Sequence, residues 1–488
     1  MSITNLFPNK EQFDTMNILL AAIANGSAEG LSVKNFESLQ HITRLGLADK
    51  LLAVGDQIET ERATSVSASI GESTGIKSVT VNDTKLINAL GSNLNGTFVL
   101  TYDGTLWLNQ IGVSVTLGNW GISVTGTPAK DDTIIINITA KSLVFDVLDF
   151  NKFTPENKNL KNSVALGMHD IFTYGTIPFC ASQLMYYTIG GLPAGNYKFT
   201  LDHACYGSST AYDGTYMFTT TKEIPATGGF RHTNPIGGWK ISYAQSDVIG
   251  NYITTYGASP LHEEIEKGIA VSIWDGTTVC TDLGTFTSQN PTYYVEDDEV
   301  NNGKRNLTER QAYGSNRWRD SVYRMWLNSD APAVDSADTT TISNWWTPKS
   351  VFDRVPGGAK LAGFLHGLDP TFVKAMGEVE VITALSNADK TETETYDVTY
   401  DKVFLQSMTE VFGGVNNGVA EGTQLEYWVG ATNEDRIKYE NNTARYWWLR
   451  SPNPSNAYGV RTVNTSGALN YYYGAYGASG VVPACCII

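Results

Sequence analysis

Positive charge is scarce in this chain of 488 residues. It contains 34 Lys and Arg residues against 50 Asp and Glu residues, which gives a formal net charge of −16, and no basic tract offsets this balance. Proteins that bind the phosphate backbone of nucleic acids need concentrated Lys and Arg side chains. We therefore expect no nucleic-acid partner.

Long apolar runs are missing as well. No stretch approaches the roughly 18 uninterrupted apolar residues that mark a transmembrane helix. The first residues, MSITNLFPNKEQFD, lack the basic start and apolar run of a secretory signal. We therefore expect neither membrane insertion nor a secretory route.

Cysteine is rare and follows no recognisable spacing. The chain contains Cys180, Cys205, Cys280, Cys485 and Cys486, with no CxxC pair. An odd number without such spacing argues against a disulfide framework and favours buried free thiols. Because neighbouring cysteines rarely bond to each other, we interpret the last two as strand residues, one packed inward and one at a sheet edge.

Patterns typical of metal binding and catalysis are also absent. The six histidines are scattered without HxH or HxxxH spacing. The acidic run 296–299 lacks the glycine and alternation of a calcium loop, so we interpret it as a solvated loop. No GxSxG, P-loop or dinucleotide fingerprint occurs. We expect no metal, no cofactor and no catalytic residue, while abundant carboxylates leave a paired-carboxylate glycosidase open.

Glycine and aromatic residues are abundant instead. The chain contains 46 Gly, 25 Tyr and 11 Trp residues, a composition that favours short strands and turns over long helices. Its length exceeds one ordinary core. We predict a β-rich α+β protein with an N-terminal helical region at 1–62, a small β-sandwich at 63–141, a β-rich subdomain at 142–275 and a final domain at 276–488.

Helical spacing appears twice near the N-terminus. Residues 9–25 and about 33–52 carry apolar residues at helical intervals. In the second stretch these residues are Phe36, Leu39, Ile42 and Leu45. The N-terminal stripe fits packing either on its own domain or on another copy of the chain, and we predict an attachment or oligomerisation role for 1–62.

Two later segments also predict helices. Residues 314–331 would form a helix that Ser315 or Asn316 caps, and 370–376 would form a shorter one. The buried stripe of the longer helix would consist of Trp318, Val322, Met325 and Trp326.

The most informative segment lies near the C-terminus. Between Asn453 and Gly480 nearly every residue is Asn, Tyr, Ser, Gly, Ala or Thr, and Arg461 is the only charge. Rigid Tyr and adaptable Ser, Gly and Asn dominate the binding loops of antibodies. A disordered low-complexity tail is the alternative. The interrupting residues Val460 and Val463 favour an ordered surface on a frame that Trp447 and Trp448 would anchor.

The same segment carries a family resemblance. YWWLRSP, then VR-V-T-SGA and GV-PAC, resembles the variable proteins of phage-encoded diversity-generating retroelements. The resemblance extends over about 140–488 and implies a C-terminal C-type-lectin-like fold with a variable region at about 453–480. TYDG-LW, GISVTGTP and DDTIII resemble an immunoglobulin-like module of phage tail and baseplate proteins, within 63–141.

The resemblance also assigns roles to residues. It implies that the framework positions are Trp447, Trp448, Arg450, Pro452, Val460, Arg461, Gly467, Ala468, Val481 and Pro483. It implies that the diversified, ligand-binding positions are Asn453, Ser455, Asn456, Tyr458, Gly459, Thr462, Asn470, Tyr471, Tyr472, Tyr473, Gly474, Tyr476, Gly477 and Ser479.

The function implied by the resemblance is that of a non-catalytic receptor-binding adhesin at a phage tail tip or fibre. Such a protein would be made in the bacterial cytoplasm, assemble into the virion with other tail proteins and bind a protein or glycan receptor on the host. Several copies raise avidity, so we expect a homotrimer. A glycan-degrading tail enzyme and a structural baseplate protein are the alternatives.

Overall fold

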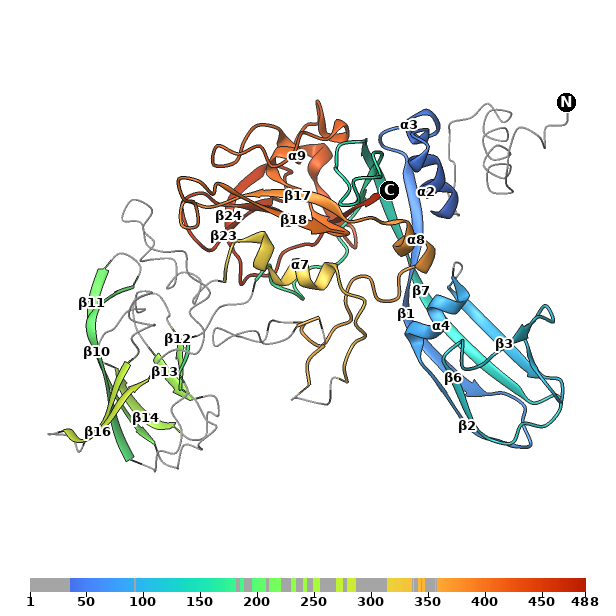
Figure 1. Ribbon diagram of the computed structural model, residues 1–488, viewed down its shortest axis with the longest axis horizontal. Coiled ribbons are helices and arrows are strands. Elements are labelled where there is room, and N and C mark those ends of the chain that lie inside the picture. The colour runs from blue at the N-terminus through green and yellow to red at the C-terminus, as the bar shows by residue number, and fades with distance from the viewer. Residues whose placement is uncertain are drawn as a thin grey trace.

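The computed structural model describes residues 36–91, 94–180, 314–335, 337, 341–343, 345–346, 356 and 358–488. It also describes the backbone of eight strands between Met185 and Phe286. The side chains of Tyr471 and Tyr472 lie outside the described residues. The predicted helix at 9–25 and the acidic run 296–299 also lie outside them. Figure 1 shows the chain coloured from N- to C-terminus.

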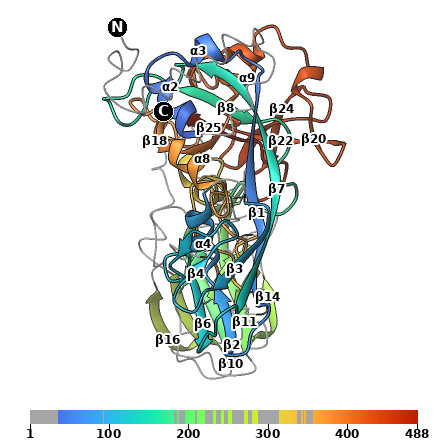
Figure 2. The same ribbon diagram turned by 90° about the vertical axis from the view of Figure 1, so that its right-hand side faces the viewer.

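Two long strands form the spine of the molecule. β1 (Gln57–Ile70) and β7 (Thr133–Phe150) pair antiparallel from Gln57↔Asp146 to Ile70↔Ile134. One end of this ribbon lies in a small lobe and the other in a larger main lobe (Figures 1 and 2). The boundaries predicted at 62 and 141 therefore fall inside continuous strands, so the two lobes share one sheet.

The small lobe is built from short antiparallel strands and one helix. β3, β4 and β5 extend the sheet from β7, and β2 pairs with β6. Their bounds are β2 Ile76–Val81, α4 Asp83–Leu90, β3 Gly96–Tyr102, β4 Trp107–Leu108, β5 Ser114–Val115 and β6 Ile122–Gly126. Alternating inward residues of β7, such as Ile134, Ile136 and Ile138, fill its core. The strands predicted for this region are therefore present.

The main lobe continues the same sheet in the order β19-β25-β8-β7. The strands involved are β8 (Val164–Met168), β19 (Val403–Leu405) and β25 (Pro483–Ile487). The other elements of this lobe are η2 Trp318–Asp320, α7 Val322–Leu327, α8 Pro370–Ala375, β17 Val379–Ala384, β18 Tyr396–Asp401, α9 Met408–Phe412, η3 Glu426–Trp428, η4 Glu434–Arg436, β20 Lys438–Glu440, β21 Thr443–Arg445, β22 Trp447–Pro452, β23 Gly459–Val463 and β24 Leu469–Gly474. The described helices are all short.

The first described helices pack on the main lobe of the same chain. The segment predicted as one helix over 33–52 forms α2 (Phe36–Arg44) and α3 (Ala48–Leu51), because Gly46 adopts a φ of 70° between them. Phe36 lies 4.5 Å from the ring of Phe372 in α8. Three residues of the predicted stripe are buried, whereas Leu45 is exposed. The stripe of α2 is thus satisfied within its own chain.

The helix predicted over 314–331 is shorter than expected. The chain first forms the 3-10 turn η2, and α7 starts only at Val322, where the Ser321 side chain accepts from the Arg324 amide. The predicted cap was therefore wrong: Asn316 donates its side-chain amide to the carbonyls of a distant loop instead. The predicted helix at 370–376 is confirmed by α8, which Asp369 caps.

Both terminal cysteines lie in the interior of the sheet. β25 pairs with β19 on one side and with β8 on the other, so neither Cys485 nor Cys486 is at an edge. This corrects the predicted inward-and-edge arrangement. Both thiols are free and fully buried, and burial raises the pKa of Cys485 and Cys486. Cys180 is buried as well.

The segment Met185–Phe286, which lies along the chain between β8 and η2 of the main lobe, contains two further antiparallel sheets, in the orders β14-β11-β10-β15-β16 and β13-β12-β9. Their strands are β9 Met185–Tyr187, β10 Gly195–Gly207, β11 Thr210–Thr220, β12 Phe230–Thr233, β13 Lys240–Tyr243, β14 Ile249–Thr254, β15 Ile269–Trp274 and β16 Val279–Phe286. The predicted β-rich character of 142–275 is therefore present, and β16, which pairs with β15, lies beyond the predicted boundary at 275. No helix of the described residues is long and apolar enough to cross a membrane.

Candidate functional site

The Tyr- and Asn-rich window lies on a three-stranded antiparallel sheet, β22–β23–β24. Trp447 pairs with Val463, and Val460 pairs with Tyr473. Between Val460 and Thr462 the register shifts, so that the single residue Arg461 faces two residues of β24, which form a β-bulge. The window is therefore an ordered part of the fold and not a tail.

Buried aromatic and valine side chains support one face of this sheet. Trp447, Trp448, Val460 and Val463 are fully buried, as expected from the sequence. The indole of Trp447 donates to the Arg436 carbonyl at 3.0 Å, so its polar atom is satisfied. Each such aromatic side chain buries roughly 150–250 Å², and the ring of the outer residue Tyr473 packs on that of Trp448, with 5.9 Å between the ring centroids.

A buried ion pair holds β22 against the rest of the lobe. The guanidinium of Arg450 binds both carboxylate oxygens of Glu410 at 2.7 and 2.6 Å, and also donates to the Leu405 carbonyl at 2.7 Å. Glu421 lies beside it, where it accepts from the Ser451 hydroxyl and from the Ala384 amide. Burial raises the pKa of Glu421, against the opposing effect of Arg450.

The structure separates the predicted ligand-binding positions by exposure. Tyr473 and Tyr476 are about half exposed, at 48% and 53%, and Ser455 is also exposed. The half-buried positions are Asn456, Tyr458, Asn470, Gly474 and Gly477. The buried positions are Asn453, Gly459, Thr462 and Ser479. Two predicted positions, Tyr471 and Tyr472, have side chains outside the described residues.

One set of these positions comes together at the loop end of the sheet. The Ala475 amide donates to the Tyr458 carbonyl at 2.9 Å, and Gly459 pairs with Gly474. A side chain on Gly477 would lie 2.2 Å from Cε1 of Tyr473, so glycine lets the ring rest on the turn. We call this set the terminal surface, and its members are Ser455, Asn456, Tyr458, Tyr473, Gly474, Tyr476 and Gly477.

The buried positions support the backbone of that surface. The Asn453 side-chain oxygen accepts from the Ser455 backbone amide at 2.8 Å, and the backbone amide of Asn453 donates to the Gly459 carbonyl at 2.8 Å. The Ser479 carbonyl accepts from the hydroxyl of Tyr323. Thr462 pairs with Asn470 farther along the strands, and their side chains lie 3.2 Å apart. The side chains of Asn453, Thr462 and Ser479 are therefore almost fully shielded from solvent.

Two asparagines outside the window hold it in place, and sequence reasoning did not find this role for either. The buried amide of Asn316 donates to the carbonyls of Asn456 at 2.8 Å and Gly459 at 3.0 Å. Asn416, also buried, donates to the Pro452 carbonyl and accepts from Nε of Arg461 at 3.0 Å. Neither has a sequence signal, because each lies far along the chain from the loop it holds.

The terminal surface can stack and hydrogen-bond, but it contains no acid or base of its own. Arg461 is the only charged side chain between Ser451 and Ala484. Within the residues that the structure describes, no group of three or more His, Cys, Asp or Glu side chains could hold a metal. The groups that this surface offers are therefore tyrosine rings, side-chain amides and hydroxyls.

Comparison with known proteins places the chain near one family. Residues 292–488 match the model of a family described as a domain of unknown function, DUF6273. This match covers the latter part of the main lobe, including the terminal surface. No curated protein and no solved structure matches the chain.

Proposed function

We propose that this chain is a receptor-binding adhesin of a phage tail tip or fibre, with the terminal surface as its ligand-binding site. The observation that carries the proposal is the contrast between Tyr473 and Tyr476, about half exposed, and the fully buried Trp447 and Trp448 beneath them. A surface that must accept different side chains needs its backbone held from elsewhere, and Asn316 supplies this support.

We also propose finer descriptions of the two lobes. The small lobe would be an immunoglobulin-like module, supported by its antiparallel strands around a core of β7 residues. The main lobe would be a C-type-lectin-like domain, supported by the position of β25 in the same sheet as β7 and β8 and by the loop-rich chain between them. The terminal surface would be diversified by a retroelement, and several copies would bind together as a homotrimer.

The binding test compares two tyrosines of equal exposure. Tyr473 and Tyr396 are both 48% exposed, but only Tyr473 belongs to the terminal surface. Binding of the labelled chain to a panel of bacterial strains would identify a host. On that host, we expect Tyr473→Ser to weaken binding about tenfold or more, since anchoring aromatics contribute most of the energy of an interface. Tyr396→Ser should leave it unchanged.

Three results would contradict the proposal. The first is equal loss of binding in both variants. The second is hydrolysis of capsule or wall polysaccharide by the purified chain, which would favour a tail enzyme. The third is the finding of identical coding segments for 453–479 in independent isolates with no reverse transcriptase gene nearby, which would favour a structural baseplate protein. Diversification instead predicts such a gene and a nearby near-copy of the segment that differs at adenines.

A further inference from the structure

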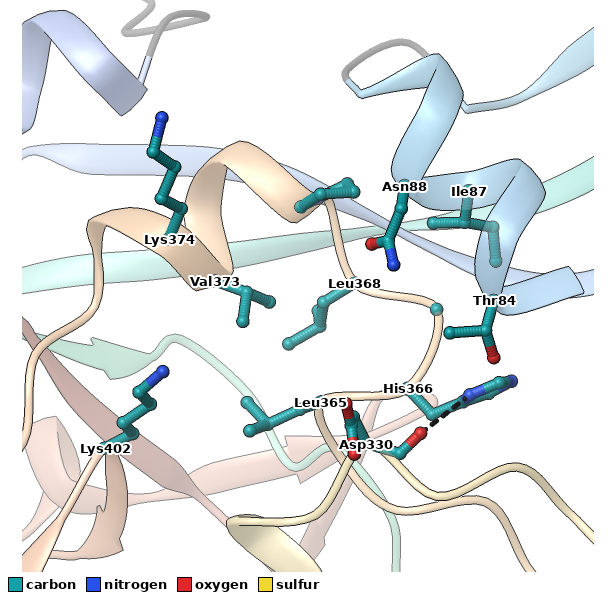
Figure 3. Close-up of a pocket in the computed structure, with 12 residues that line it drawn as sticks. Thr84, Ile87, Asn88, Asp330, Leu365, His366, Leu368, Val373, Lys374 and Lys402 are labelled. Atoms are coloured by element: carbon teal, nitrogen blue, oxygen red, sulfur yellow. Dashed lines mark hydrogen bonds between the residues drawn. The ribbon is translucent and has the colours of Figure 1, made fainter. Parts of the chain in front are cut away.

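A trough lies at the junction of the two lobes, away from the terminal surface. One hollow of about 200 Å³ is lined by residues of α4 and by the segment 365–374. A second, of about 370 Å³, extends towards Tyr400 and Glu378. The two hollows share Asp330, Leu365, Val373 and Lys402. Figure 3 shows the first hollow, with Asn88 and Thr84 of α4 facing the main lobe across it.

Lys402 is the unusual residue of this trough. It is half-buried and lines both hollows, yet no salt bridge to it forms within the part of the chain that the structure describes. A partly buried ammonium is stabilised by a counter-charge. The protein has an excess of carboxylates, so an unpaired lysine here calls for a local explanation.

The carboxylates around Lys402 have other partners. Asp401 accepts from Nε of Arg324 at 2.7 Å and from the indole of Trp318 at 3.0 Å. Glu378 is exposed and forms no salt bridge to Lys402 among the described residues; desolvation and its hydrogen bond and repulsion with Glu156 raise its pKa, whereas attraction to Lys402 lowers it. Asp330 is exposed on the rim, beyond salt-bridge distance of Lys402.

Apart from Lys402 and Asp330, the first hollow is lined by apolar residues in its middle and by polar residues at its edges. In Figure 3, Val373 lies between Lys374 and Lys402, and Leu365 and Leu368 lie beside it, on the side towards α4. Lys374 is exposed and already pairs with Glu37 at 3.3 Å. The backbone amides at the start of α8 are engaged by the Asp369 side chain, so no helix terminus is left there for a phosphate. Among the described residues that line the hollow, Lys402 is therefore the lysine without a salt bridge.

We propose that this hollow binds a small organic carboxylate with an apolar body. The carboxylate would pair with Lys402, and the body would lie on Leu365, Leu368 and Val373. About 200 Å³ is available, and an apolar cavity of roughly 150 Å³ is enough for benzene. The ligand is thus of the size of benzoate or a short fatty acid. This site is independent of the terminal surface, and its ligand contacts both lobes.

The test uses the full chain and benzoate as the probe, with benzamide as its neutral counterpart, in calorimetric titrations at low salt. Benzoate should bind about tenfold or more tightly than benzamide, since only the anion gains the charge-assisted bond. Lys402→Met should remove this preference, and Lys402→Arg should retain it. The matched control is Lys50→Met, at a lysine of α3 whose side chain is 71% exposed, and it should leave benzoate binding unchanged within about twofold.

A second variant tests where benzoate binds, by filling the hollow with a larger side chain and leaving its charge unchanged. Asn88 is exposed on α4 and lines the hollow, so Asn88→Trp should cover it without disturbing the core and should weaken benzoate binding. The proposal is overturned if benzoate gives no binding heat, if benzamide binds equally well, or if Lys402→Met has no effect. Inorganic phosphate should not displace benzoate. If it displaced benzoate at equal concentration, the proposal would be overturned, because the hollow would then bind anions without any need for an apolar body.

Discussion

The buried ion pair beneath the terminal surface gives the sharpest test of the main-lobe structure. Arg450 and Glu410 are each about 1% exposed or less. Replacing Arg450 by Met keeps most of the side-chain volume but removes both hydrogen bonds to Glu410 and the bond to the Leu405 carbonyl. Removing one partner of a buried pair costs about 3–5 kcal/mol, because the other charge is left uncompensated.

We expect a loss of stability at the lower end of that range, because Glu410 keeps one hydrogen bond. Glu410 also accepts from the Ser407 amide at 2.9 Å, as part of the capping box of α9, so one of its oxygens keeps a donor. We therefore expect Arg450→Met to lower the free energy of unfolding by about 3 kcal/mol. Urea unfolding followed by tryptophan fluorescence measures this loss, because buried indoles such as Trp428 and Trp447 lie in the same lobe.

Two further variants make the result interpretable. Arg319 is 47% exposed and binds Asp397 at 3.1 Å, so Arg319→Met should cost less than about 1 kcal/mol. The double variant Arg450→Met with Glu410→Gln should lose clearly less than the sum of the single variants, since the uncompensated charge is gone. A loss of about 1 kcal/mol or less for Arg450→Met would refute the reasoning, as would strict additivity in the double variant.

Three other predictions follow from individual contacts. Burial raises the folded-state pKa of Glu421 above its ordinary 4.5; the folded protein then holds this proton more tightly than the unfolded chain. The unfolding free energy should therefore fall as pH rises from about 4.5 towards neutrality, and Glu421→Gln should flatten that slope in urea titrations at several pH values. Asn316→Leu should cost about 1–3 kcal/mol, because the Asn456 carbonyl loses the side-chain amide that donates to it and the Gly459 carbonyl keeps only the Asn453 backbone amide; limited proteolysis should then cut 453–459 faster. Gly467→Ala should lower the melting temperature in calorimetry, because φ is 77° and the new methyl group would lie 1.6 Å from the Asn433 carbonyl oxygen.

Local patterns predicted the elements that depend on neighbouring residues. The helix at 370–376 was found from its spacing, and the structure starts it at Pro370 after the Asp369 cap. The strands of 63–141 and the inward positions Val460 and Val463 were found from alternation. Such signals act over a few residues, so they survive whatever the rest of the chain does.

Predictions failed where a distant contact competes with a local one. Asn316 has the side chain of a helix cap, but the loop 456–459 offers it carbonyl partners in the core, and Ser321 caps the helix instead. The sequence does not tell whether Cys486 lies at a sheet edge or in the sheet interior. Only the pairing of β25 with both β8 and β19 shows that it is interior.

The sequence by itself determined that the chain is β-rich, that its terminal window is chemically suited to recognition and that a few aromatic and valine residues would hold that window. The tertiary structure decided which window residues reach the surface: Tyr473 and Tyr476 do, whereas Asn453 and Thr462 are buried. It also decided which residues from elsewhere support them, and it placed Lys402 between the two lobes. The physical reason is that composition and periodicity report only on near neighbours. Exposure and charge pairing depend on chain segments that meet only when the whole sheet has formed.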